Sequence, residues 1–213
     1  MNPLTKLTVC LAAICAAACS GSLFQSKAAP PTIYVLSAQA GSPAAGSPSA
    51  EIPVDLAILK PRVRPGLETD RIAVLYPDRH LDYFADARWS GPLGEVLQDL
   101  AVQEFHSRAH LRTVSGDASV IASAYWLEME VTDFQAEYTS AAEAPTVHVH
   151  LQARIGSSND RRILSQFAAN AQQRATENRL TAIVDAYAHA ADAALADIAA
   201  QAADSLTKNS ESR

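Results

Sequence analysis

Apolar residues recur along the chain with two different periods, and these periods separate predicted strands from predicted helices. Alternation is clearest in 123–138 and 147–154. In these segments the apolar residues lie on one side of the predicted strand, and Glu, His, Gln and Arg lie on the other. A period of two is typical of a strand with one buried face. Strands are predicted at 32–37, 54–59, 71–76, 81–84, 111–114, 123–138, 147–154 and 161–175.

Two other segments repeat their apolar residues at helical spacing. The first follows Ser90, which is expected to cap a helix with Pro92 in its first turn, and it runs to about Ser107. The second, 178–206, is rich in alanine and carries a continuous apolar stripe. The order of strands, helix, strands and helix predicts an α+β fold: a single domain with a mostly antiparallel sheet and two helices packed on one face.

The first 18 residues have the layout of a secretory signal. Lys6 provides a positive start, an apolar run follows it, and small residues lead into Cys19. The apolar run has about 12 residues, too few for a bilayer that needs about 20. We therefore predict a signal peptide at 1–18.

The positions of the cysteines indicate that the leader is followed by an acylated residue. All three, Cys10, Cys15 and Cys19, lie in it or next to it, so the mature chain keeps at most one and has no internal disulfide. Cys19 after small residues resembles a lipobox, and acyl chains on it would anchor the protein. Ala16 stands where Leu is usual, so an ordinary signal with a cysteine by chance is the alternative. Ser20, next to Cys19, favours the outer membrane over the inner one.

Composition and charge narrow the class of protein further. The chain is 48% apolar and 19% charged, as globular proteins are, and its net charge is −6. An acidic surface does not bind nucleic acid, whose phosphates require clustered Lys and Arg. We expect a lipidated tether at 19–31, a folded domain at 32–206 with a flexible Gly-Ser-Pro loop at 38–51, and a disordered, fraying tail at 207–213.

The sequence has little that indicates catalysis. It contains no nucleophile elbow, phosphate loop or dinucleotide fingerprint. His148 and His150 share a strand face but have no obvious third ligand, so we interpret them as exposed histidines that bind no metal. Asp78, Asp82 and Asp86 surround His80 and are interpreted as a solvated loop. We predict neither a cofactor nor an enzyme.

A Trp beside an Arg is a common interface anchor, and Arg88-Trp89 precedes the first predicted helix. We take Tyr83, Arg88 and Trp89 as a candidate partner interface. Packing of Trp89 in the core is the competing interpretation, because large apolar rings are usually buried.

Several blocks in order resemble the ABC-type transport auxiliary lipoprotein component family, which includes the paraquat-inducible protein C type of intermembrane-transport lipoprotein. The stretch from Gly66 to Leu93 is the most specific. The matching residues are Tyr34-Val-Leu36, Leu56-x-Ile58-x-x-Pro61-x-Val63-x-x-Gly66-Leu67, Thr69-Asp70-Arg71-Ile72, Leu81-x-Tyr83, Arg88-Trp89, Pro92-Leu93 and Tyr125-x-Leu127-x-x-x-Val131-x-x-Phe134. The Gly-Ser-Pro insertion departs from the family pattern.

The resemblance implies a non-catalytic partner of an ABC transport system that moves lipids or other hydrophobic compounds between two membranes. The partners it implies are an MCE-family protein and the ABC permease and ATPase of the same system. The lipoprotein would sit on the periplasmic side of the outer membrane, held by its lipid anchor. The protein is also a candidate for forming a homo-oligomer.

Two other functions stay as alternatives. One is a periplasmic lipid carrier, with a ligand cavity between sheet and helices. The other is a hydrolase that uses His80 and a nearby Asp.

Overall fold

The computed structural model describes residues 30–38, 52–116, 123–140 and 142–211. All of the secondary structure in these ranges belongs to one compact unit that begins at Pro31. A single sheet of nine strands forms its framework.

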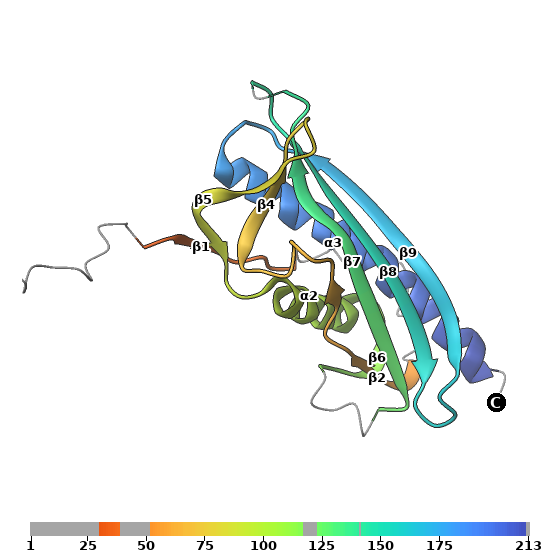
Figure 1. Cartoon of the computed structure of the whole chain (residues 1–213). Helices are drawn as coiled ribbons and strands as arrows, with labels where there is room; N and C mark the ends of the chain where they lie inside the picture. Colours follow the sequence, from red (N-terminus) through yellow and green to blue (C-terminus); the bar gives the residue numbers. More distant parts are fainter. Residues whose placement is uncertain (1–29, 39–51, 117–122, 141, 212–213) are drawn as a thin grey trace, which may run out of the picture. The chain divides into compact units, whose positions relative to one another are not determined.

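Strand β7 (Tyr125–Glu137) is the central strand of this sheet (Figure 1). Along one edge it pairs antiparallel with β8 (Thr146–Ser157), which in turn pairs antiparallel with β9 (Ile163–Arg174). Its other edge is shared in succession by three shorter parallel strands. These are β2 (Ile52–Ile58), β3 (Arg62–Val63) and β4 (Arg71–Leu75).

The remaining strands extend the sheet at its sides. Strand β5 (Leu81–Trp89) pairs antiparallel with β4, β1 (Thr32–Tyr34) adds parallel to β5, and β6 (Leu111–Ser115) adds parallel to β2. The parallel pairings are short, whereas β7, β8 and β9 pair over most of their length. The predicted α+β class with a mostly antiparallel sheet is confirmed.

The alternation of β7 and β8 separates an inner face from an outer face. Leu127, Met129 and Val131 point inward and are almost fully buried. The ladder shifts between Val131 and Asp133, so that Phe134 is also buried at 1% exposure. This bulge keeps the apolar residues of a long, bent strand on one side.

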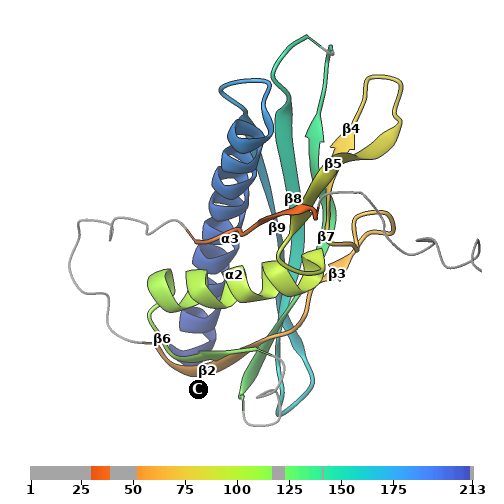
Figure 2. The same ribbon diagram turned by 90° about the vertical axis from the view of Figure 1, so that its left-hand side faces the viewer.

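Both helices lie on the inner face, as predicted (Figure 2). Helix α3 (Leu180–Glu211) packs along β8 and β9, and α2 (Leu93–Arg108) packs against α3 and the β2–β6 pair. Alanines of α3 such as Ala194 and Ala199 are buried, which allows the helix to approach the sheet closely. In the described residues no helix combines the length and apolar character needed to cross a membrane.

The start of α2 differs from the prediction, because Ser90 does not cap it. Pro92 occupies the N-cap position without a side-chain hydrogen bond, and the helix begins at Leu93. The Leu93 N–H instead donates to the Thr69 carbonyl at 3.1 Å. A backbone contact from a distant loop therefore replaces the expected hydroxyl cap.

The end of α3 also differs, because the helix continues through Glu211 where a fraying tail was predicted. Leu206 is fully buried, and the Asn209 amide donates to the Tyr125 hydroxyl at 3.0 Å. Lys208 pairs with Asp204 at 2.6 Å, one helical turn back. These contacts keep the polar C-terminal segment of α3 helical.

Two strand boundaries were missed as well. Pro61 and Pro65 were interpreted as strand stops, yet the two residues of β3 pair with β7 between them. Strand β5 runs five residues beyond its predicted end at Phe84. Its regular alternation is broken near Asp86, which has a positive φ of 53°. The part of the predicted flexible loop at 39–51 lies outside the described residues.

Gly156 provides a test of the packing on the outer face. It lies opposite Trp126 in the β7–β8 ladder, and a Cβ added to it would lie 2.3 Å from Cζ2 of the indole. Gly156→Ala must therefore displace Trp126, and we expect the free energy of unfolding in urea to fall by about 1–3 kcal/mol. In a Trp126→Ala background the same change should cost much less. An equal cost in both backgrounds would contradict this packing.

Candidate functional site

The segment from Gly66 to Leu93, which carries the most specific part of the family resemblance, folds around a corner formed by Thr69 and Asp70. Asp70 accepts two hydrogen bonds from Arg88 of β5, at 2.9 and 2.7 Å. Its carbonyl also accepts the Trp89 N–H at 2.6 Å. The corner therefore fixes the junction between β5 and α2, and it leaves the Arg88 guanidinium at the surface with 44% of its side chain exposed.

Tyr83 is held by the same part of the chain. Its hydroxyl donates to the Gly66 carbonyl at 2.7 Å, and Arg71 lies 3.9 Å from its ring centroid, in cation–π contact. Gly66 has a φ of +91°, which favours glycine. Sequence reasoning singled out Tyr83 but missed Arg71, because this contact depends on the pairing of β4 with β5.

Strand register gathers these residues into one surface. Arg71 pairs with Arg88, and Arg88 pairs with Ile33 of β1, so three side chains form a row across three strands. Ile33 is 54% exposed and Val35 is 68% exposed, which is unusual for β-branched apolar side chains. We call the set Ile33, Val35, Asp70, Arg71, Tyr83 and Arg88 the β1–β5 surface.

Trp89 points the other way, into the core. It is 2% exposed, and its ring meets Tyr187 and Phe134 edge to face at centroid distances of 5.2 and 6.1 Å. Neighbouring residues of a strand face opposite sides, so Arg88 and Trp89 lie on opposite faces of β5, and the face of Trp89 is the one that packs against the core. The indole thus has the core position that was weighed against an interface role, and it supports the β1–β5 surface from beneath.

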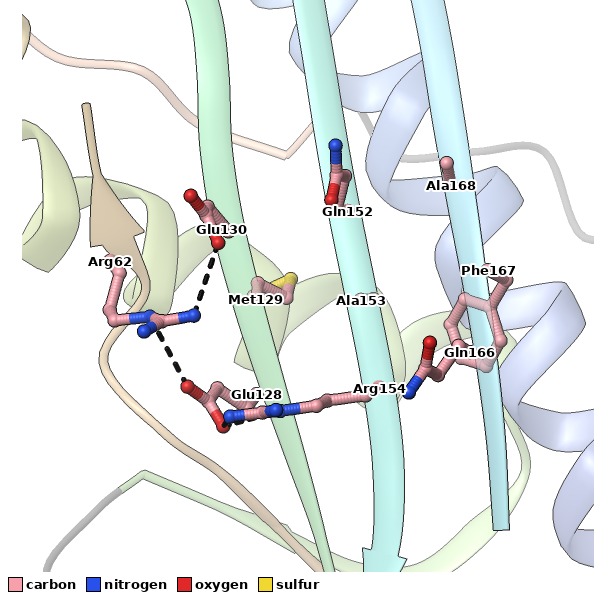
Figure 3. A pocket seen from close by; sticks show the side chains of 10 residues that line it. All are labelled: Arg62, Glu128, Met129, Glu130, Gln152, Ala153, Arg154, Gln166, Phe167 and Ala168. Carbon is pink, nitrogen blue, oxygen red and sulfur yellow. Dashed lines mark hydrogen bonds and ion pairs between the residues drawn. The ribbon is translucent and has the colours of Figure 1, made fainter. Parts of the chain in front are cut away.

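A second polar region covers the outer face of β7 and β8 (Figure 3). Arg62 lies 3.3 Å from Glu128 and 3.1 Å from Glu130, and Arg154 lies 2.6 Å from Glu128. These side chains line a shallow pocket of about 400 Å³, called here the outer pocket. Alternation predicted that both glutamates face solvent, but it could not show their pairing with arginines on β3 and β8.

The histidines on this face each pair with one carboxylate. His148 Nε2 lies 3.7 Å from Glu137, and His150 Nδ1 lies 3.6 Å from Asp133. In the described part of the chain, no group of three or more His, Cys, Asp or Glu could hold a metal ion.

The cluster around His80 does not form an acid–base site. The His80 ring stacks on Tyr76 at a centroid distance of 5.8 Å. Asp78 accepts a hydrogen bond from the backbone of His80 rather than from its ring, and Asp82 and Asp86 are exposed. The predicted exposure is confirmed, but only Asp78 and His80 lie in a loop, since Asp82 and Asp86 belong to strand β5.

One buried acid was missed by the sequence analysis. Glu104 of α2 is 1% exposed and lies against Arg108 and Asp192 at the contact with α3. Burial, with a further contribution from Asp192, raises the pKa of Glu104 to about 7, although Arg108 acts in the opposite direction. Glu104 lies four residues after Leu100 and seven after Leu97, so helical spacing places it on the buried face of α2, although a charged side chain is not expected there.

The fold defines a class of α+β domain, in which two helices cover one face of a single, mostly antiparallel sheet. The chain belongs to the ABC-type transport auxiliary lipoprotein component family, which it matches over residues 34–200. The predicted lipidation site, Cys19, lies outside the described residues. No curated protein matches the sequence.

Solved structures share this fold at low sequence identity. Protein XCC0632 from Xanthomonas campestris, described as a DUF330 protein, is 20% identical with a TM-score of 0.71, and the match covers 84% of this chain and 99% of that one. An uncharacterized protein is 14% identical with a TM-score of 0.62, covering 81% and 99%. Hypothetical protein CT253 from Chlamydia trachomatis is 11% identical with a TM-score of 0.50, covering 72% and 98%.

The raised pKa of Glu104 predicts a defined pH dependence of stability. The folded state holds the proton more tightly than the unfolded state, whose carboxyl has the ordinary value of 4.5. Its contribution is therefore complete below pH 4.5 and is lost as the pH rises to about 7. Glu104→Gln should stabilise the protein more at pH 8 than at pH 5, relative to wild type, in urea unfolding.

Asp99→Asn is the matched control, because Asp99 is exposed on the same helix. Its effect should be the same at both pH values. Parallel stability profiles for wild type and Glu104→Gln would contradict the assigned protonation of Glu104.

Proposed function

We propose that this protein is a non-catalytic docking lipoprotein that holds the MCE component of an ABC transport system at the outer membrane. The system would carry lipids or other hydrophobic compounds across the cell envelope. The observation that carries the proposal is the family match over residues 34–200. The predicted leader at 1–18, followed directly by Cys19, supports it, since a lipid anchor would keep a docking domain at a membrane.

The β1–β5 surface is the proposed site of docking. It combines exposed Ile33 and Val35 with the Arg88–Asp70 pair and the Tyr83 ring. Aromatic and arginine side chains beside exposed apolar residues are typical of protein interfaces. Strand β1 also begins 13 residues after Cys19, so this surface belongs to the part of the domain nearest the predicted anchor along the chain.

The interior favours docking over the alternative of a lipid carrier. The space between sheet and helices is filled by rings such as Phe105, Phe134 and Tyr187, which are almost fully buried. Where α2 meets α3 in the described residues, a cavity of about 10 Å³ remains. That volume accommodates about one water molecule, far less than an acyl chain needs.

Removing the anchor should release the protein from membranes. Cys19→Ser cannot be acylated, so we expect the exported chain to move from the membrane fraction to the soluble periplasmic fraction in flotation experiments. Cys15→Ser is the matched control and should stay with the membrane. The mass of the mature N-terminal peptide should show acyl chains on Cys19 in the wild type. A Cys19→Ser protein that still floats with membranes would overturn the proposed anchoring.

Charge reversal in the β1–β5 surface should weaken docking. Ile33→Asp with Arg88→Glu places two acids in the proposed interface, and we expect crosslinking of the full-length lipoprotein to the MCE component to fall by at least about tenfold, or 1.4 kcal/mol. Arg174→Glu on β9 reverses an exposed arginine elsewhere and should leave crosslinking unchanged. Unfolding curves check that each variant is folded. Equal crosslinking by wild type and the double variant would remove this surface as the docking site.

A further inference from the structure

Strand β9 is an open edge of the sheet that lacks the usual protection against other strands. Within the described residues it pairs only with β8. Positions 163–173 contain no Pro, Lys, Arg, Asp or Glu, although such residues commonly keep foreign strands away from an edge. A long, uncharged edge of this kind is a template for pairing with another chain.

The contacts of Ala168 show which backbone groups face this open edge. Gln201 of α3 donates to the Ala168 carbonyl at 3.4 Å. Because N–H and C=O groups of one residue point to the same side in an antiparallel strand, and sides alternate, Gln166, Asn170 and Gln172 also present their backbone groups outward. Residues between them pair with β8.

Two hollows flank the edge at one place along β9. On the inner side, a groove of about 470 Å³ lies between β9 and α3. Half-buried Leu164 and Phe167 provide its apolar surface, and polar side chains of α3 such as Asp204 and Lys208 line the rest. On the outer side lies the outer pocket, with its paired arginines and glutamates (Figure 3). Gln166 and Phe167 line both hollows.

We propose that an extended segment of a partner protein adds as a new strand beside residues 164–168 and replaces the hydrogen bond from Gln201 to the Ala168 carbonyl. Alternate side chains of such a strand point to opposite faces. One large apolar side chain would enter the β9–α3 groove, and its polar neighbours would face Arg62, Arg154 and the glutamates of the outer pocket. Backbone bonds along the edge supply affinity, and the two hollows supply specificity.

The chemistry of the edge points to a polypeptide of this pattern rather than to another occupant. Outward N–H and C=O groups are matched by another extended backbone, which a lipid does not have. A second copy could bring its own β9 with Phe167 on the inner side, so dimerisation of the wild-type protein that Gln166→Pro abolishes would overturn the proposal of a different partner. The inference stands apart from the docking function proposed above, since it requires neither the MCE partner nor the β1–β5 surface.

The test uses random dodecapeptides displayed on phage and the full-length lipoprotein in detergent. We expect the enriched peptides to alternate a large apolar residue with polar residues. A synthetic copy of an enriched peptide should slow hydrogen exchange of backbone amides within 163–170 of the wild-type protein, and its scrambled version should not.

Gln166→Pro and Gln172→Pro form a matched pair. Both replace an outward-facing N–H, so neither removes a bond to β8, but only Gln166 lies at the hollows. Gln166→Pro should weaken peptide binding at least about tenfold, and Gln172→Pro by less than about twofold. The proposal is overturned if no enriched peptide protects β9 in the wild-type protein, or if both folded variants bind equally well.

Discussion

Hydrogen bonding along both edges of β7 is the constraint on which the rest of this structure depends. One edge is satisfied by β8 along its length, and the other by β2, β3 and β4 in turn. A buried strand cannot leave its backbone groups unpaired. The chain therefore returns three times to the same strand, which brings the N-terminal strands, the Gly66–Leu93 block and the C-terminal meander into one sheet.

The same strand separates a dry face from a wet one. Its inner row is apolar and packs under α3, whereas its outer row is acidic and is paired with arginines of β3 and β8 and histidines of β8. The arginines offset part of the negative charge on this outer face. Among the described residues, the cavity where α2 meets α3 has only about 10 Å³, and the larger hollows lie on the outer face and beside β9.

The two edges of the sheet at β1 and β9 differ in the side chains and backbone groups that they present. Strand β1 lies nearest the predicted anchor and presents Ile33 and Val35 next to Arg88. Strand β9 lies on the other side of the sheet and presents a neutral backbone edge between two hollows. The two proposed binding edges therefore differ in chemistry, and together they would allow the domain to contact more than one partner segment.

The sequence alone determined the strand and helix periods, which depend only on neighbouring residues, and the acidic net charge, which is a sum over residues; it also predicted a leader at 1–18 before Cys19. It therefore predicted the fold class and which residues of β7 face inward. The tertiary structure decided that Trp89 is buried beneath an exposed Arg88, that Arg71 covers Tyr83, that Glu104 is buried, and that α3 extends to Glu211. These contacts join residues far apart in the chain, and strand register and helix packing, which no local pattern encodes, bring them together.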